Sequence, residues 1–254
     1  SNSGTGNSGN IFVDFGSPSN STAGNWNNIT DHQGANVELI DDQGAKVGIT
    51  LTITDPFYNG YNTSGTTAPT GDAAAIFPST ATSDNFFGHG NAWSTTAANP
   101  EGIFTLSGLD KTKYYSFKIF ASRPSASDDR ETLYTATGAG TKTATLNAST
   151  NVSSFAKIDS LLPDNSGVIT IKCSAGVNNT TAEKFYYIGA MKITVVGNQT
   201  GVTLPKAAAF SAYYSNGVIK IPDYKLDKLE DGSYRVLTTI KIDGYFDFYT
   251  RMLI

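Results

Sequence analysis

Aromatic side chains in polar, glycine-rich segments are the residues of this sequence best suited to binding chemistry. Trp93, Tyr58 and Tyr61 stand among Gly, Asn, Thr and Ser residues. The apolar C–H face of a pyranose ring stacks on such rings, while neighbouring amide and charged groups bond to its hydroxyls. We predict a sugar-binding platform; the alternative is that these rings close the ends of the core, which is the role expected for Trp26 and Phe87.

Two arginines could complete such a platform. Arg123 and Arg130 flank the short segment 124–129. Because a guanidinium group forms paired hydrogen bonds to a carboxylate, both arginines are predicted to contact an acidic sugar. The alternative is an ion pair with a neighbouring acid such as Asp128.

No arrangement typical of catalysis is recognisable. The two histidines, His32 and His89, have no Gly-x-Ser-x-Gly partner, and the single cysteine, Cys173, lies in an alternating strand pattern. The adjacent acids Asp128 and Asp129 stand beside turn residues, which favours solvated turn acids over a catalytic pair. We predict that the protein is not an enzyme and has no organic cofactor.

Hard oxygen donors in loops raise a separate expectation of metal binding. Asp84, Asp128 and Asp129 are predicted ligands of a structural calcium ion, although the sequence has no EF-hand spacing. The alternative is that these side chains form ordinary Asx turns.

Composition and charge narrow the class of partner. With 18 Lys and Arg against 22 Asp and Glu, the net charge is −4, so we predict no nucleic-acid partner. No apolar run is long enough to span a membrane. Only 16% of residues are charged, and Ser, Thr, Asn and Gly abound, which indicates a secreted or cell-surface protein.

The elements that must position these residues are short strands. Apolar residues recur with a period of two between clusters of turn residues, which is typical of strands. These patterns occur at 11–15, 37–40, 47–53, 103–106, 114–121, 132–137, 142–146, 168–173 and 186–195. They predict an all-β fold, a jelly-roll-like β-sandwich over 11–196 that follows a flexible N-terminal segment, 1–10. The stretch 54–100 has few strand patterns and is predicted to be an elaborate functional loop.

A second, smaller β unit is predicted at 202–254, after a linker at 197–201. Two tight hairpins are indicated by Asn216-Gly217 and Asp243-Gly244. Its last residues are apolar, so they should pair within the unit, with the sandwich or with another molecule. The predicted assembly residues are Tyr245, Phe246, Phe248, Leu253 and Ile254.

Several motifs together resemble those of secreted Bacteroidota β-sandwich modules, of the carbohydrate-binding or malectin-like jelly-roll kind. They are IFVDFG at 11–16, GNWNN at 24–28, YSFKIFASR at 115–123, RETLY at 130–134 and YYIGAM at 186–191. The resemblance covers about 11–196 and implies a noncatalytic binding module on the cell surface.

Two shorter motifs resemble other features of such proteins. Residues 215–221 are similar to part of the small sorting domains of type IX secretion. The tripeptide 159–161 resembles the Bacteroidota O-glycosylation motif, which implies a modified Ser160.

Three functions remain open from the sequence. The first is a noncatalytic, extracellular glycan-binding or surface-adhesion module with a glycan or cell-surface partner. The second is a structural subunit of an extracellular fibre or surface assembly, which self-assembles through the C-terminal strand. The third is an accessory domain of a polysaccharide-degrading enzyme.

Overall fold

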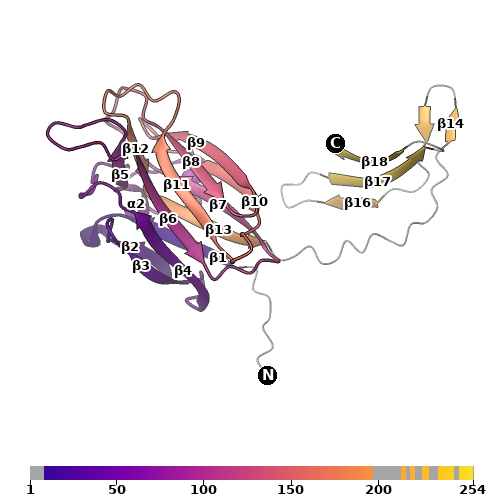
Figure 1. Ribbon diagram of the computed structural model, residues 1–254, viewed down its shortest axis with the longest axis horizontal. Helices are drawn as coiled ribbons and strands as arrows, with labels where there is room; N and C mark the ends of the chain where they lie inside the picture. The colour runs from indigo at the N-terminus through magenta and orange to yellow at the C-terminus, as the bar shows by residue number, and fades with distance from the viewer. Residues whose placement is uncertain are drawn as a thin grey trace. The chain divides into compact units, whose positions relative to one another are not determined.

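Alternating apolar and polar residues form the strands of two facing sheets (Figure 1). The computed structural model describes residues 9–196 and, beyond them, 213–215, 218–220, 225–228, 234–242 and 246–253. The chain divides into two units, Ser1–Asn198 and Gln199–Ile254. The predicted linker lies outside the described residues, as does the predicted flexible segment except for its last two residues.

The first sheet has five strands in the order β10-β7-β13-β1-β2. Their bounds are Ala156–Leu161, Tyr114–Phe120, Ala190–Val196, Asn10–Phe15 and Trp26–Ile29. The strand β1 begins one residue before its predicted start, since Asn10 pairs with Thr194. It runs antiparallel to β13 and parallel to β2.

The second sheet has six strands in the order β3-β4-β6-β11-β8-β9. Their bounds are Asn36–Ile40, Lys46–Asp55, Glu101–Ser107, Ile169–Ala175, Glu131–Thr137 and Thr141–Asn147. All neighbours in this sheet are antiparallel. An all-β sandwich was predicted, and the two sheets confirm it.

The inward-facing side chains of both sheets form one continuous core. Ile11, Val13 and Phe15 of β1 are fully buried, as is Phe104 of β6. The rings of Phe15 and Phe104 lie 5.3 Å apart and join the two sheets. Cys173 is also fully buried in this core, and burial raises the pKa of its thiol.

The stretch 54–100 is a chain of short elements rather than one open loop. It contains α1 (Gly71–Ala74), α2 (Ser79–Thr82) and β5 (Phe86–His89). Phe57 anchors its beginning, because its ring lies over Gly102 where a Cβ atom would be only 2.6 Å away. The period-two patterns gave no signal for the two helices, each of which has only four residues.

A second, smaller core lies on the outer face of the five-stranded sheet. Residues 70–84, here called the cover segment, contribute Phe77 and Ala81, which pack with Phe120 of β7 and Ala190 of β13. The rings of Phe77 and Phe120 are 5.7 Å apart. The sheet is therefore buried on both faces where the cover segment lies.

In the described part of the C-terminal unit, the strands form two sheets. β14 (Tyr213–Ser215) pairs with β15 (Val218–Lys220), and β16 (Lys225–Lys228), β17 (Tyr234–Ile242) and β18 (Phe246–Leu253) form a sheet in that order. Both predicted hairpins are confirmed by antiparallel pairing across Asn216-Gly217 and Asp243-Gly244.

We expect Phe77→Ala to destabilise the first unit by about 3–5 kcal/mol, because it empties the centre of the second core. Urea unfolding followed by tryptophan fluorescence measures this, since both tryptophans, Trp26 and Trp93, belong to the first unit. Val177→Ala is the control, because Val177 is 92% exposed and should change stability by less than about 0.5 kcal/mol. A Phe77→Ala loss no larger than the control would contradict the packing of the cover segment.

Candidate functional site

A separate two-stranded sheet gathers aromatic residues at the end of the sandwich. β5 pairs antiparallel with β12 (Phe185–Ile188), which places Phe87 opposite Tyr187 and His89 opposite Phe185. β12 is fixed to the six-stranded sheet, because the Tyr187 N–H donates to Thr132 Oγ1 and the Tyr134 hydroxyl donates to the Tyr187 carbonyl. The backbone that carries these rings is thus held on both sides.

Six rings make up what is here called the aromatic cluster: Tyr58, Phe87, His89, Trp93, Phe185 and Tyr187. Tyr58 lies 4.7 Å from Phe87 and 5.5 Å from Trp93. Trp93 meets Phe185 edge to face at 5.3 Å. Two predicted binding residues, Tyr58 and Trp93, are therefore brought together.

Trp93 is the exposed member of this cluster. Its side chain is 37% accessible, whereas Phe87 and Phe185 behind it are buried. The Trp93 N–H donates to the Thr96 carbonyl at 3.0 Å, and the Thr96 N–H returns a bond of 2.9 Å. Because a closed turn and buried rings hold the indole, it is presented to solvent in a fixed position.

His89 lies fully buried within the aromatic cluster. Its Nδ1 is 2.8 Å from the Asn91 carbonyl, which can only accept, so Nδ1 carries the proton. In the neutral ring Nε2 is then an acceptor, and it has no hydrogen-bond partner. The ring thus leaves one unused acceptor next to Trp93 and Tyr58.

Arg130 forms the polar edge of the aromatic cluster. Its guanidinium lies 5.1 Å from the Phe185 ring centre, and its Nη1 donates to the Tyr187 hydroxyl at 2.6 Å. Its Nε lies 2.9 Å from Asp128 Oδ1, and this bond holds the pKa of Asp128 below its usual range. The alternative role of Arg130, pairing with Asp128, is therefore confirmed.

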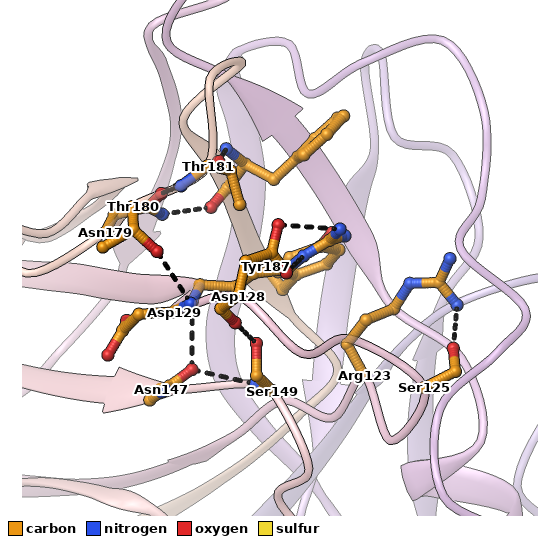
Figure 2. A network of polar contacts seen from close by, with 12 residues as sticks. Arg123, Ser125, Asp128, Asp129, Asn147, Ser149, Asn179, Thr180, Thr181 and Tyr187 are labelled. Atoms are coloured by element: carbon orange, nitrogen blue, oxygen red, sulfur yellow. Dashed lines mark hydrogen bonds and ion pairs between the residues drawn. The ribbon is translucent and has the colours of Figure 1, made fainter.

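Arg123 also approaches Tyr187, and its side chain forms fewer hydrogen bonds than that of Arg130. Burial raises the pKa of the Tyr187 hydroxyl, while the charges of Arg130 and Arg123 oppose that rise. Figure 2 shows the Arg123 guanidinium directed toward Ser125, whose Oγ is 3.5 Å from Nη1. Among the described residues, Arg123 takes part in no ion pair within 4.0 Å.

A network of polar contacts fixes the loop that carries Arg130 (Figure 2). The Ser149 hydroxyl donates to the Asp128 carbonyl, and the Asp129 N–H donates to Thr180 Oγ1 at 2.9 Å. Asp129 Oδ1 in turn accepts from the Glu131 N–H at 2.8 Å. The two acids of this loop are thus used in an ion pair and an Asx turn.

The predicted metal ligands do not form one group. Asp84 is 1% exposed and accepts a 2.6 Å bond from the Ser17 N–H, whereas Asp128 and Asp129 belong to the Arg130 loop. Within the described ranges, no three His, Cys, Asp or Glu residues lie close enough to hold a metal together.

Tyr61 and Trp26 lie apart from the aromatic cluster. Tyr61 donates its hydroxyl to the Thr30 carbonyl and packs at 4.7 Å from His32. Trp26 packs at 5.0 Å from Phe12 and beside the second core. The structure therefore does not bring Tyr61 together with Trp93 and Tyr58.

The remaining predicted sites are distributed over other elements. Ser160 is exposed at an irregularity of β10, with a φ of 52°, and its modification stays a prediction. Phe246, Phe248 and Leu253 belong to β18, while Tyr245 and Ile254 lie outside the described residues.

Phe185, Tyr187 and His89 were not predicted as site residues. The sequence reads FFGH at 86–89 and FYYI at 185–188, two short aromatic runs about 100 residues apart. Their pairing was not visible, because period-two patterning identifies strands but not their partners. Both segments contain consecutive aromatic residues instead of alternating apolar and polar ones. Such a run is expected of a strand that is buried on both faces, and it could have indicated these two strands.

No family model and no curated protein matches the chain, but solved structures similar to it include a plant extracellular domain and CBM35 modules. It is 8% identical to the extracellular domain of ANXUR2 from Arabidopsis thaliana, with a TM-score of 0.40 over 90% of this chain and 48% of that one. The chain thus spans about half the length of the ANXUR2 domain.

The second kind of neighbour is a CBM35 module. The CBM35 of Abf62 from Cellvibrio japonicus is 16% identical, with a TM-score of 0.29 over 59% of this chain and 97% of that one. A Xyl-CBM35 solved with a glucuronic acid containing disaccharide is 18% identical, with a TM-score of 0.26 over 43% and 79%. With TM-scores below 0.5, these similarities do not assign the chain to a family.

We expect Tyr187→Phe to lower the free energy of unfolding by about 1–3 kcal/mol, because the half-buried Arg130 loses the hydroxyl that accepts its Nη1 proton. Urea unfolding of the first unit measures it. Tyr114→Phe is the matched control, since Tyr114 is 37% exposed. Equal stability of the two variants would contradict an energetic role for the Arg130–Tyr187 bond.

Proposed function

We propose that the chain is a noncatalytic glycan-binding module of a secreted or cell-surface protein. The observation that carries this proposal is the aromatic cluster with its exposed indole, Trp93, which contacts the Phe185 ring on which Arg130 lies. An exposed ring on a fixed backbone costs little conformational entropy when a ligand stacks on it. A sugar ring is a ligand of the matching shape and polarity.

The polar groups around Tyr187, a member of the aromatic cluster, suit the hydroxyl and carboxylate groups of a sugar. Arg130 is engaged by Asp128 and Tyr187, so it supplies positive charge and orients the Tyr187 hydroxyl rather than offering free donors. The Arg123 guanidinium forms no ion pair with a described residue; its Nη1 lies 3.5 Å from Ser125 Oγ, and the group also approaches the Tyr187 hydroxyl. We therefore assign the direct contact with an acidic sugar to Arg123.

A noncatalytic role is supported by the surroundings of the two histidines. His89 Nδ1 bonds to a main-chain carbonyl and His32 Nε2 lies 3.0 Å from Asn59 Oδ1. Neither histidine is therefore hydrogen-bonded to a hydroxyl or thiol nucleophile that it could activate.

In the described residues, no helix is long and apolar enough to cross a membrane.

We expect Trp93→Ala to weaken glycan binding at least tenfold, because central aromatic anchors dominate such interfaces. A glycan array with neutral and acidic polysaccharides identifies the ligand. Isothermal titration calorimetry then measures the affinity of the unchanged protein and of Trp93→Ala, because this substitution removes the indole that a fluorescence titration would follow.

Tyr114→Ala is the matched control, since Tyr114 is equally exposed at 37% but belongs to β7. It should bind as the unchanged protein does. The proposal fails if no glycan binds, or if Trp93→Ala and Tyr114→Ala bind equally well.

The second candidate function is self-assembly through the C-terminal unit. In the described part of this unit, the order β16-β17-β18 leaves β18 hydrogen-bonded on one side. An open strand edge accepts a strand from another molecule through main-chain hydrogen bonds. This pairing is what a fibre or surface-assembly subunit would use.

Deletion of residues 245–254 should then abolish polymers while the sandwich stays folded. Light scattering after size-exclusion chromatography and negative-stain microscopy measure assembly, and near-ultraviolet circular dichroism reports the sandwich. A full-length chain that remains monomeric, or a truncated chain that still polymerises, would contradict assembly through β18.

A further inference from the structure

Two buried carboxylates outside the aromatic cluster lack partners for part of their charge. Asp14 of β1 is 3% exposed and Asp84 is 1% exposed. In each of them Oδ1 has no hydrogen-bond partner. Neither residue belongs to an ion pair with a described lysine or arginine.

The register of the five-stranded sheet places Asp14 under the cover segment. Asp14 pairs with Ala190, and Ala190 pairs with Phe120, so the three side chains point to one face. That face is the outer one, because Ala190 and Phe120 pack against Phe77 in the second core. Asp14 is therefore buried between the sheet and its cover.

Asp84, at the end of the cover segment, brings its carboxylate to the same place. A Cβ atom on Gly16 would lie 2.4 Å from the carboxylate atoms of Asp84. Alternate residues of an extended chain share a face, so this missing side chain would point to the Asp14 side. Consistently, burial and the charge of Asp84 raise the pKa of Asp14 to about 7.

Each carboxylate is anchored through one oxygen and leaves the other free. Asp14 Oδ2 accepts from the N–H and the hydroxyl of Thr22, at 3.1 and 2.7 Å. Asp84 Oδ2 accepts from the Ser17 N–H at 2.6 Å. Since burying an unpaired carboxylate is costly, two such groups together call for a positive partner.

We propose that Asp14 and Asp84 are ligands of a divalent cation of the calcium class, bound between the five-stranded sheet and the cover segment. Hard carboxylate oxygens are the ligands that such cations take. The ion would join β1 to the end of the cover segment. Because β5 begins two residues after Asp84, it would also fix the strand that carries Phe87 and His89.

The competing arrangement is a proton shared by the pair without a metal. The two arrangements differ in how the unchanged protein responds to calcium, whereas Asp14→Asn does not respond to calcium in either. A shared proton makes this variant indifferent to calcium, as the unchanged protein would also be. A bound cation makes the unchanged protein calcium-dependent and the variant not.

The test uses the full 254-residue chain, stripped with EDTA and titrated with calcium chloride or magnesium chloride. We expect calcium at one hundred times its Kd to raise the Tm of the unchanged protein by about 5–10 °C. Elemental analysis should find one calcium ion per chain. Asp14→Asn and Asp84→Asn should lose both the ion and the Tm rise.

In EDTA, Asp14→Asn should be at least as stable as the unchanged protein, because the repulsion between the two carboxylates is removed. A variant of this stability is folded, so its loss of the calcium response would not be due to unfolding. Asp164→Asn is the control, since Asp164 forms an Asx turn, and it should keep the full response. The proposal is overturned if the unchanged protein shows neither bound metal nor a Tm shift up to about 10 mM calcium, above the range of extracellular calcium modules. It is also overturned if Asp14→Asn and Asp84→Asn still bind the ion.

Discussion

The pairing of β5 with β12 is the interaction on which the candidate site depends. After β4 the chain leaves the six-stranded sheet and crosses the outer face of the five-stranded sheet as the cover segment. It then forms β5, which belongs to neither sheet. Four residue pairs with β12 then set Phe87 against Tyr187. β12 itself is tied to β8 by the Tyr134 hydroxyl and by Thr132 Oγ1. The exposed Trp93 stands on rings whose positions follow from these main-chain contacts.

Buried amide side chains form hydrogen bonds that connect strands and loops which do not pair through their main chains. Asn27 of β2 donates to the carbonyls of Phe12 and Ile40 and accepts from the Ile40 N–H, so it links β1 to the edge strand β3 of the other sheet. Asn85 exchanges bonds with the main chain of Ser122 in the same way. A buried amide satisfies donors and acceptors without burying charge. The high Asn content and low charge of the sequence therefore serve the interior as well as the surface.

The sequence was informative about strands and turns and less so about what lies between them. The alternation at 11–15 and 168–173 predicted β1 and β11, and Asn216-Gly217 predicted a hairpin, because these features depend on neighbouring residues only. The polar stretch 54–100 contains both Tyr58 and Trp93, and the structure brings their rings together, while their role in binding stays a prediction. Tyr187 and Phe185 were missed, because their place in the cluster depends on a partner strand about 100 residues earlier. Tyr61 was grouped with Trp93 by composition, although its ring packs on His32.

The buried charges of Arg130 and of Asp14 with Asp84 differ in whether neighbouring side chains compensate them. Arg130 is half-buried, but Asp128, the Tyr187 hydroxyl and the Phe185 ring all face its guanidinium, so its charge is compensated within the chain. The alternation of Ile-Phe-Val-Asp-Phe would place Asp14 on the outer, solvated face of its sheet. The cover segment removes that solvent and adds Asp84 without adding a cation. Since no lysine or arginine of the described residues pairs with either carboxylate, we infer that a proton or a metal ion compensates them.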